Sequence, residues 1–530
     1  MPRTKRLITT LALTALGLAG SAAVQAAPAL ASTSQETIFQ DDTQLHADTA
    51  GTLQTLKELG VDRVRVFVTW ASIAPNPSST TKPRGFDATD PASYPQSGFA
   101  FYDNLVTEAA LDGIGVYFTV TGPAPSWAAH GGPSGTNGAW KPSAHEFGSF
   151  VTALAKRYSG SYDPALGTQS PGDPGDLPKV HYWGIWNEPD YGVDLAPQTI
   201  HGSALEVAPA VYRGLLDAAW SALHANGHGS DTILIGELAP RGQTTVRFGL
   251  PGTSGGMVPI RFLRALYCVD ANGKPLRGSF AAQRSCPTNS AGSRGFASAH
   301  PGLFQATGFA DHPYPTSQAP LVPTWPNGGT NLYTDWTQLP ALEQFLDKAQ
   351  RTYGQHRRFA IYNTEFGEKM PPVSQTNGPY YLNWFEYLSW RSSRLVSYDQ
   401  YLLVNPPMGN FPSALEDIHG RKLAIYSAFR LPLYLPATTA GRGRSLEVWG
   451  DLRPAKFYPA SGELQFQRGS RGAFTTIKTV TGSSRREYFD TRVTFPASGT
   501  VRIAWAYPPS APAELAGTTV YSRSQKITIK

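Results

Sequence analysis

Charged residues and cysteines are both scarce in this 530-residue chain. Asp, Glu, Lys and Arg together make up 16% of it, and there are only 2 cysteines. So little charge argues against an intrinsically disordered chain or a coiled coil, because both are rich in charged residues. The two cysteines form no set with the spacing of zinc ligands, and the zinc-protease pattern His-Glu-x-x-His is absent.

Clusters of basic residues are missing as well, and after residue 31 no apolar stretch is long enough to span a bilayer. The formal net charge of +6 includes Arg3, Lys5 and Arg6 in the first segment of the chain. Without them, 42 Lys and Arg face 39 Asp and Glu, a net charge of about +3. We therefore expect neither nucleic acid nor a membrane anchor among the partners.

The first 31 residues have the pattern of a secretory signal peptide. The basic start MPRTKR precedes the apolar run LITTLALTALGLAGSAAV and small residues suited to cleavage after Ala26 or Ala31. This pattern predicts a secreted, extracellular protein. In that compartment Cys268 and Cys286 are expected to form one local disulfide, with two free buried thiols as the alternative.

Glycine and proline, by contrast, are plentiful, with 52 and 44 residues, and aromatics make up 12% of the chain. This composition is typical of a loop-rich globular protein with aromatic-lined surfaces. Helical periodicity recurs between the loops, for example in the apolar stripe of HEFGSFVTALAKRY. Between such segments lie eight short apolar runs that predict strands: 36–40, 62–68, 113–120, 180–186, 232–238, 308–314, 358–365 and 395–404.

Eight strand-then-helix units predict an α/β fold, a (β/α)₈ TIM barrel. The alternative, an open doubly wound sheet, lacks the G-x-G-x-x-G pattern after its first strand. After residue 435 the helical periodicity gives way to short alternating runs separated by Gly, Ser and Pro. They predict a small all-β sandwich of immunoglobulin-like or fibronectin-like type. The expected domains are a signal peptide (1–31), a catalytic barrel (32–435) and a sandwich (436–530).

Two carboxylates fall at the ends of predicted barrel strands. HYWGIWNEPDYG, residues 181–192, begins as a buried strand and places Glu188 at its tip, and FAIYNTEFGE places Glu365 at the tip of the seventh strand. The C-terminal ends of the strands form the active-site face of a TIM barrel. Two carboxylates about 5–5.5 Å apart can cleave a glycosidic bond with retention of configuration, without a metal or an organic cofactor.

These motifs resemble those of the clan A retaining glycoside hydrolases, in particular families 5 and 39. WNEP and TEFG carry most of the likeness, and VRVFVTWASIAP, DHPYP and AFRLPL follow in the family's order. The resemblance spans most of residues 36–435, and the chain is similar to secreted actinobacterial-type enzymes with a C-terminal β-sandwich. It implies a carbohydrate substrate with an equatorial scissile bond, a β-D-glycoside or an α-L-arabinoside.

Carried over residue by residue, the resemblance implies that Glu188 is the acid/base and Glu365 the nucleophile. Asn187 would hydrogen-bond the 2-hydroxyl of the sugar, and Tyr314 the carboxylate of the nucleophile. The catalytic roles of Glu188 and Glu365 require that the strand tips carrying them meet at the same end of the barrel.

Further residues are expected to shape the sugar-binding subsite. Arg65 and His312 would support it, with a structural ion pair and a buried core imidazole as the alternatives. Trp70 and Trp127 lie near strand ends and are candidates for stacking on a sugar face, with core packing as the alternative. Glu237, a third carboxylate at a strand tip, is expected to bind a substrate hydroxyl, with a decoy carboxylate that has no part in the reaction as the alternative.

The sequence departs from the family at the eighth strand, where relatives often place a Trp beneath the reacting sugar. SYDQYLLVN (397–405) offers Tyr398 or Gln400 there, and Tyr398 is our candidate for substrate binding. Glu368, three residues past Glu365, is expected to face solvent.

Other functions compete with hydrolysis. GTSGG (252–256) fits the G-x-S-x-G esterase pattern, but Ser254 lies in a Gly-rich loop without the strand and helix of a nucleophile elbow. A barrel that only binds carbohydrate would not need two close carboxylates, which repel each other. A transglycosylase would use the same residues and differ only in its products. The oligomeric state stays open, and for the sandwich we favour a role in covering the barrel over polysaccharide binding.

Overall fold

The computed structural model describes residues 32, 35–133, 136, 138–169, 171–172, 174–200, 205–243, 255–315, 318–323, 332–407, 411–482 and 485–530. The predicted signal peptide and Ser254 lie outside these residues. Within them, no helix combines the length and the apolar character needed to cross a bilayer.

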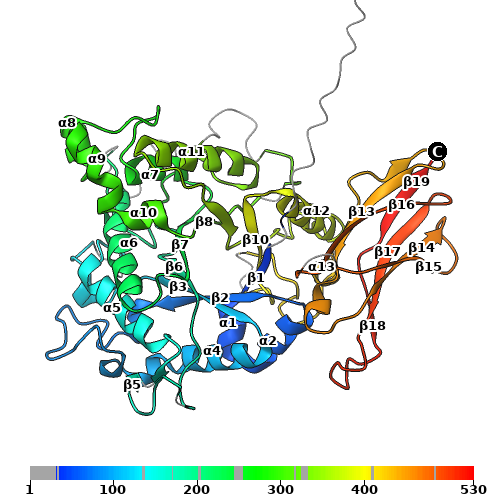
Figure 1. Ribbon diagram of the computed structural model, residues 1–530, viewed down its shortest axis with the longest axis horizontal. Coiled ribbons are helices and arrows are strands. Elements are labelled where there is room, and N and C mark those ends of the chain that lie inside the picture. The colour runs from blue at the N-terminus through cyan, green and yellow to red at the C-terminus, as the bar shows by residue number, and fades with distance from the viewer. Residues whose placement is uncertain are drawn as a thin grey trace, which may run out of the picture.

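Eight parallel strands close into a barrel, and the last of them, β10, pairs with the first, β1. In order around the barrel they are β1 (Glu36–Gln40), β2 (Arg63–Thr69), β3 (Gly115–Thr121), β6 (Tyr182–Ile185), β7 (Thr232–Leu238), β8 (Gly308–Asp311), β9 (Ala360–Asn363) and β10 (Leu395–Tyr401). Each overlaps one of the eight predicted runs. The prediction of a (β/α)₈ TIM barrel is therefore confirmed (Figure 1).

Helices form the outer layer around these strands (Figure 1). They are α1 (Asp42–Ala47), α2 (Thr49–Glu58), α3 (Trp70–Ile73), α4 (Ala100–Asp112), α5 (Ala144–Arg157), α6 (Ala208–Ala225), α7 (Pro259–Leu266), α8 (Gly278–Ala282), α9 (Ser290–Ala299), α10 (Pro301–Gln305), α11 (Leu339–Thr352), α12 (Asn377–Arg391) and α13 (Ala424–Arg430). In α5 the predicted apolar stripe is the buried face, with Phe147, Phe150 and Leu154 fully buried. Ser143 caps this helix by accepting a hydrogen bond from the backbone N–H of Glu146.

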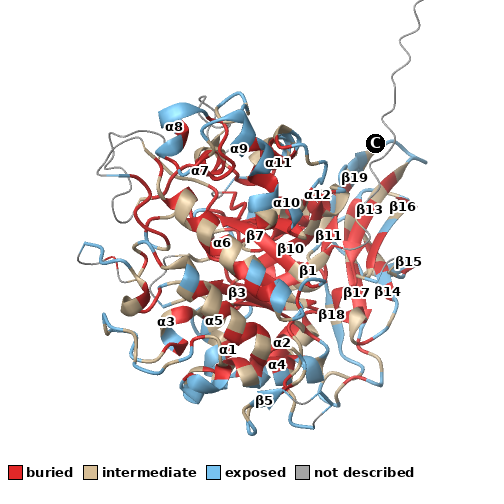
Figure 2. Ribbon diagram, turned by 60° about the vertical axis from the view of Figure 1, so that its left-hand side comes forward, coloured by how far each residue is buried: buried red, intermediate tan, exposed pale blue. Residues whose placement is uncertain are grey.

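The barrel strands are largely buried (Figure 2), and the alternation of their side chains separates two kinds of core. In β2, Val64, Val66 and Val68 are fully buried in the apolar layer shared with the helices. Arg65, between them, lies on the opposite face of the strand and points into the barrel. The same alternation in the other strands fills the lower barrel with a small cluster of Tyr117, Leu234, Ala310 and Tyr362. The barrel is thus apolar outside its wall and polar at the level of the strand tips.

A disulfide joins Cys268, beyond the end of α7, to Cys286, beyond the end of α8, with 5.6 Å between their Cα atoms. The predicted local disulfide is confirmed.

The C-terminal region forms two sheets, one of β11, β13 and β16 and one of β12, β14, β15, β17, β18 and β19. The strands are β11 (Leu433–Tyr434), β12 (Thr439–Ala440), β13 (Ser445–Asp451), β14 (Gly462–Arg468), β15 (Thr475–Val480), β16 (Tyr488–Thr494), β17 (Gly499–Ala506), β18 (Thr519–Tyr521) and β19 (Gln525–Ile529). Val448 of the first sheet and Leu464, Val501 and Ile503 of the second share one apolar core. The region is therefore a β-sandwich. Its short strand β11 begins three residues before the expected boundary at residue 436.

The sandwich lies beside α12 and α13 (Figure 1), and buried polar contacts join it to the barrel there. Arg453, in the sandwich, donates to Glu386 Oε1 at 2.6 Å and Oε2 at 2.7 Å, and to the carbonyl of Phe429 at 2.8 Å. Tyr488 of β16 also donates to Glu386, at 3.0 Å. Both members of the ion pair are almost completely buried. Such contacts bind the sandwich to the barrel wall, away from the strand tips.

We expect Arg453→Met to destabilise the whole protein, because it leaves the carboxylate of Glu386 buried without its cation. Breaking a buried ion pair in this way costs about 3–5 kcal/mol. The measurement is the free energy of unfolding in urea, followed by tryptophan fluorescence. Arg468→Met, on an exposed position of β14, is the control and should change stability by about 0.5 kcal/mol or less. Equal effects of the two substitutions would contradict the assignment.

Candidate active site

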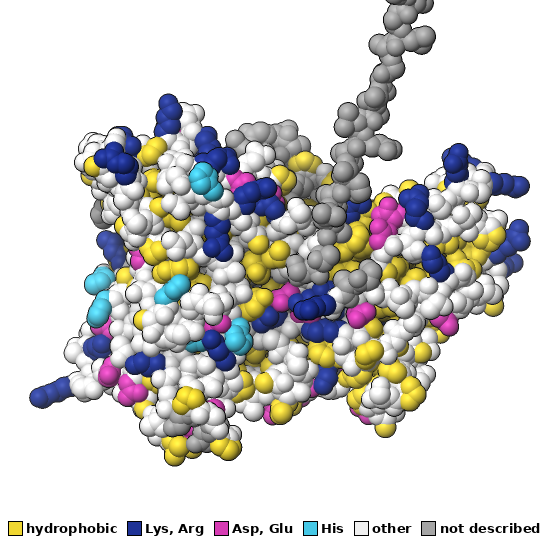
Figure 3. All heavy atoms as spheres, in the orientation of Figure 1, with side chains coloured by type: hydrophobic (Ala, Val, Ile, Leu, Met, Phe, Trp, Pro, Cys, Tyr) yellow, Lys and Arg dark blue, Asp and Glu magenta, His cyan; other side chains and the backbone are white. Residues whose placement is uncertain are grey.

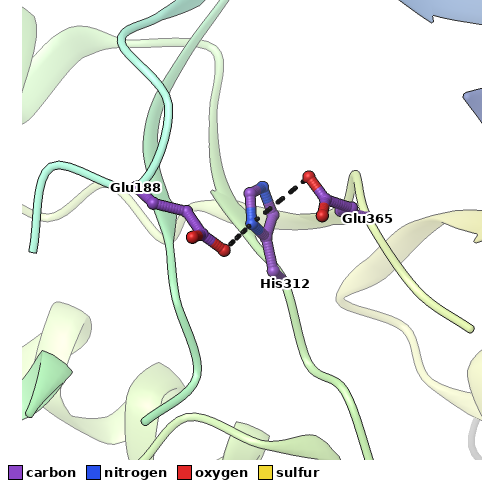
Figure 4. A group of neighbouring side chains, drawn as sticks. All are labelled: Glu188, His312 and Glu365. Atoms are coloured by element: carbon purple, nitrogen blue, oxygen red, sulfur yellow. Dashed lines mark hydrogen bonds and ion pairs between the residues drawn. The ribbon is translucent and has the colours of Figure 1, made fainter. Parts of the chain in front are cut away.

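The tips of β6 and β9 bring two carboxylates and an imidazole together. Glu188 follows β6, Glu365 follows β9 and His312 follows β8. One oxygen of each carboxylate and one ring nitrogen of His312 all lie within 4.8 Å of one another. Figure 4 shows the imidazole between the two carboxylates, with contacts to both. The predicted convergence of Glu188 and Glu365 is what the fold produces.

The backbone at Glu188 is held in an unusual conformation by its neighbours. Trp186 and Glu188 have φ values of 67° and 36°, in the left-handed region that non-glycine residues rarely adopt. The N–H of Asn187 donates to Thr121 Oγ1 on β3 at 3.1 Å, and that of Glu188 donates to the carbonyl of Glu237 on β7 at 2.9 Å. Such strain costs roughly 1–3 kcal/mol per residue and persists only where the surroundings enforce it. Here two neighbouring strands do so, and Glu188 is turned toward the centre.

The carboxylate of Glu365 is fixed by a hydrogen bond on each oxygen. Tyr314 donates its hydroxyl to Oε1 at 2.8 Å, as the resemblance predicted, and Arg65 donates Nη1 to Oε2 at 2.9 Å. The next residue is held too, because the N–H of Phe366 donates to Asp399 Oδ2 at 3.0 Å. A carboxylate held by two such hydrogen bonds cannot rotate freely.

Arg65 lies beneath the two carboxylates and is completely buried. Its Nη2 donates to Asn187 Oδ1 at 2.9 Å and to Glu237 Oε2 at 3.0 Å, and its Nε donates to Thr119 Oγ1 at 2.9 Å. A further hydrogen bond goes to Gln40. Arg65 is therefore both a structural ion-pair partner and a support of Glu365, and it does not reach the cavity.

His312 donates to two carboxylates, Glu188 Oε1 from Nδ1 and Glu237 Oε2 from Nε2, both at 2.9 Å. Burial by itself would lower the pKa of His312. The charge of Glu365 and the hydrogen bonds to Glu188 and Glu237 outweigh burial and raise the pKa well above its usual value. His312 is therefore an imidazolium at neutral pH, which is why both of its ring nitrogens can donate.

Glu237 is turned into the barrel by a bulge. The pairing of β7 with β8 shifts register between Gly236 and Leu238, and Glu237 itself has a φ of 49°. Without this irregularity the two-residue alternation of the strand would point Glu237 outward with Ile235. The glycine at position 184 on β6 provides the space for this side chain, since a Cβ there would lie 2.7 Å from Glu237 Oε1.

The side chain of Glu237 is completely buried and contacts only protein. Besides Arg65 and His312 it accepts hydrogen bonds from Thr364, at 2.7 Å, and from Tyr117. Burial would raise the pKa of Glu237, but Arg65 and His312 bring it below its ordinary value. The expectation that Glu237 binds a substrate hydroxyl is therefore wrong, and it acts as the buried counter-charge of Arg65 and His312.

A cavity of ≈ 340 Å³ opens above this network, a size that suits a small ligand or part of a larger one. Glu188 and Glu365 lie in its wall, with 21% and 12% of their side chains exposed. Four aromatic rings accompany them, and the full lining is Glu188, Tyr191, Ala239, Pro240, Arg241, Tyr314, Glu365, Gly367, Lys369, Tyr401 and Phe411. Aromatic faces and fixed carboxylates in one cavity suit a polyhydroxylated ligand with apolar C–H faces.

Three further predicted binding residues, beyond the buried Arg65 and Glu237, lie away from this cavity. Trp70 is completely buried and stacks on Phe150 with 5.8 Å between ring centroids, so core packing is its role. Trp127 packs edge-on against Trp70 and donates its indole N–H to the carbonyl of Pro75 at 3.0 Å. Both tryptophans are part of the outer layer because β2 and β3 end before them.

Tyr398 is the third, and its neighbour Tyr401 lines the cavity in its place. The hydroxyl of Tyr398 donates to the carbonyl of Leu382 on α12 at 3.2 Å, and its ring packs on Phe366. The two tyrosines are three positions apart, and an odd spacing along a strand puts them on opposite faces. The candidate in the eighth strand was therefore the wrong tyrosine.

Several residues of the cavity were not predicted. Tyr191 follows WNEP, Arg241 follows the tip of β7, and Lys369 follows TEFG. Asp194, three residues past Tyr191, lies outside the lining but close to both carboxylates. Burial and the charges of Glu188 and Glu365 raise the pKa of Asp194 to about 8. The signal that could have found them is proximity in sequence to a strand tip, since these loops line the mouth of a TIM barrel.

Glu368 corrects another expectation, because it is completely buried and does not face solvent. Among the residues that the structure describes, neither of its carboxyl oxygens has a hydrogen-bond partner. Burial raises the pKa of Glu368 to about 8. The loop after Glu365 thus folds inward, and this carboxyl is neutral at neutral pH.

No known protein family and no curated protein matches the sequence. Among solved structures, a family 39 glycoside hydrolase from Bacteroides cellulosilyticus WH2 is similar with a TM-score of 0.45 at 14% identity, over 93% of this chain and 79% of its own. The family 1 β-glucosidase from Thermotoga maritima has a TM-score of 0.43 at 14% identity, over 73% and 84%. The exo-β-1,4-mannosidase Op5Man5 from Opitutaceae bacterium strain TAV5 has 0.41 at 14%, over 75% and 58%. Similarity at this level carries no argument about function, which must be inferred from the residues of the cavity.

We expect Glu368→Gln to stabilise the protein at pH 8 and much less at pH 5. The folded protein keeps the proton of Glu368 up to about pH 8, whereas an unfolded chain releases it near the ordinary value of 4.5. Stability therefore falls as pH rises between these values, by about 2–4 kcal/mol in all, and a neutral Gln removes that loss. Urea unfolding at several pH values measures it, with the exposed Glu514→Gln as control. An equal increase in the free energy of unfolding at pH 5 and pH 8 would contradict this explanation.

Proposed function

We propose that the protein is a secreted retaining glycoside hydrolase that cleaves O-glycosidic bonds of an oligo- or polysaccharide by double displacement. The observation that carries the proposal is the approach of Glu188 and Glu365, whose nearest oxygens lie within 4.8 Å in one cavity. Retaining enzymes hold their two carboxyl groups ≈ 5–5.5 Å apart, whereas inverting enzymes need ≈ 6.5–9.5 Å to admit a water molecule. The short separation favours retention.

In the first step Glu365 attacks the anomeric carbon while Glu188 protonates the leaving oxygen. The C–O bond to the leaving group breaks, and an ester bond between the sugar and Glu365 forms. Tyr314 and Arg65 hold the attacking carboxylate in position, which lowers the entropic cost of the attack.

In the second step Glu188, now a carboxylate, takes a proton from water, and the water oxygen attacks the anomeric carbon. The ester bond breaks and Glu365 leaves as a carboxylate, so the configuration at the anomeric carbon is inverted twice and therefore retained. The imidazolium of His312 lies 2.9 Å from Glu188 and orients it in both steps. No step requires a metal or an organic cofactor.

We also propose that the amide of Asn187 binds the substrate beside the reacting centre. Its Oδ1 accepts a hydrogen bond from Arg65 at 2.9 Å, which fixes the amide plane and assigns its NH₂ group as a donor. In this proposal that donor serves the 2-hydroxyl of the reacting sugar, where a hydrogen bond that strengthens in the transition state accelerates cleavage.

We expect Glu365→Ala to lower kcat by about three orders of magnitude or more on aryl glycosides, because the covalent intermediate cannot form. Azide should restore part of the activity and give a glycosyl azide of inverted configuration. Glu188→Ala should affect substrates with poor leaving groups most and give the retained azide. Glu514→Ala, exposed in the sandwich, is the control. Carbohydrate binding without turnover by the unmutated protein would instead indicate a non-catalytic barrel.

We also expect the two tyrosines of β10 to behave differently. Tyr401→Ala removes a ring from the cavity wall and should raise KM about tenfold, consistent with the 0.5–1.5 kcal/mol of an aromatic contact. Tyr398→Phe removes only a hydroxyl that faces α12 and should leave kcat/KM within about twofold. Steady-state kinetics on the same aryl glycoside compares them, and the reverse order would contradict the assignment of Tyr401.

A further inference from the structure

Two cations, Arg241 and Lys369, lie in the wall of the cavity that holds Glu188 and Glu365. Arg241 follows β7 and Lys369 follows β9. Burial lowers the pKa of both, and the charge of Arg241 lowers that of Lys369 further. The second effect means that the two positive charges lie close enough to repel each other.

Arg241 is paired with the buried Asp335, whereas Lys369 has no close carboxylate among the residues that the structure describes. Arg241 donates Nη2 to the carbonyl of Tyr314 at 2.6 Å, but among the described residues its Nε is buried without an acceptor. Asp335 Oδ2 lies 3.7 Å from this Nε, beyond hydrogen-bond distance. For Lys369, no carboxylate of the described part of the chain lies within 4.0 Å, and its Nζ instead rests over the ring of Phe411, 3.9 Å from the centroid.

The catalytic carboxylates do not require these cations. Glu188 is bound by His312, and Glu365 by Arg65 and Tyr314. Arg241 and Lys369 take no part in that network. On the face drawn in Figure 3, Lys and Arg side chains are spread over the surface, some of them next to Asp and Glu. In the cavity, two cations thus lie in the wall without taking part in the catalytic network, and Lys369 has no carboxylate partner among the described residues.

A series of contacts shows how far Lys369 lies from the nucleophile Glu365. The Phe411 ring beneath it packs edge-on against Tyr314, with 4.7 Å between centroids. Tyr314 in turn donates to Glu365 at 2.8 Å. We call Arg241 and Lys369 together the cationic wall. Two aromatic rings separate Lys369 from the nucleophile, and this spacing places the cationic wall beside the reacting sugar or the sugar next to it.

We infer that the cavity takes an anionic glycan, and that Arg241 and Lys369 bind an oxyanion that one of its sugars carries. The planar guanidinium can hold two oxygens of such a group, and the ammonium adds a point charge. The oxyanion is a uronic acid carboxylate or a sulfate ester, which share this chemistry. The inference rests on the proposed function only in taking the ligand to be a glycan.

Titration calorimetry on the full chain tests this with matched pairs of oligosaccharides. Oligomers containing glucuronic, galacturonic or mannuronic acid are each compared with their carboxyl-reduced, neutral counterparts, and sulfated galactan oligomers with desulfated ones. In at least one pair the acidic member should bind about tenfold or more tightly than its neutral match. Sodium chloride at about 0.5 M should reduce that preference, because salt screens ion pairs. The pair that responds distinguishes carboxylate from sulfate.

Variants of Lys369 test whether the cationic wall causes the preference for acidic oligomers. Lys369→Met should reduce the ratio of acidic to neutral affinity about tenfold, whereas Lys369→Arg should keep most of it. Lys526→Met, on an exposed position of β19, should leave the ratio unchanged. Equal affinities within every pair, no binding in any pair, or a preference that survives Lys369→Met would each overturn the inference.

The outcomes separate this inference from the proposed function. Binding needs no turnover, so Glu365→Gln should keep the preference for the acidic oligomers. Hydrolysis of glycosides without any such preference would overturn the anionic ligand alone. A preference for acidic oligomers without hydrolysis of any of them would overturn the hydrolase and leave the cationic wall in place.

Discussion

A single buried cation, the guanidinium of Arg65, holds the centre of this molecule together. It lies on β2 and contacts Glu237 after the bulge of β7, Glu365 beyond β9, Asn187 beyond β6 and Thr119 on β3. A charge without exposure to water is tolerated only if it is paired and fully hydrogen-bonded. Each of these strand tips must therefore reach the same point, and the position of Glu365 follows from that requirement.

The barrel makes such a network possible by excluding water beneath it. The apolar cluster of Tyr117, Leu234, Ala310 and Tyr362 fills the lower interior, so the charges above it interact in a medium of low polarity. There, charge pairs are stronger than at a surface. The same condition keeps His312 protonated, because the anions around it outweigh the cost of burial. Chemistry and architecture thus depend on the same set of buried contacts.

Two layers of side chains divide the work at the strand tips. The buried layer, with Arg65, Glu237 and His312, fixes the orientation of the two carboxylates. The upper layer comes from the loops after the strands and includes Arg241 and Lys369. Loops can change without disturbing the buried network. On our proposals, the buried layer serves the reaction and the loop layer selects the ligand.

The sequence by itself determined what depends on neighbouring residues along the chain. Apolar runs and helical periodicity identified the eight strands and α5, because burial on a regular element leaves a regular pattern. The strand tips identified Glu188 and Glu365, since the end of a parallel strand is recognisable locally. Tertiary structure alone decided which side chains point into the barrel or the cavity at positions where the sequence pattern does not specify the direction. The bulge of β7 points Glu237 inward, the loop after Glu365 buries Glu368, and β10 exposes Tyr401 to the cavity in place of Tyr398. Each of these outcomes depends on contacts between segments far apart in the chain, which no local pattern records.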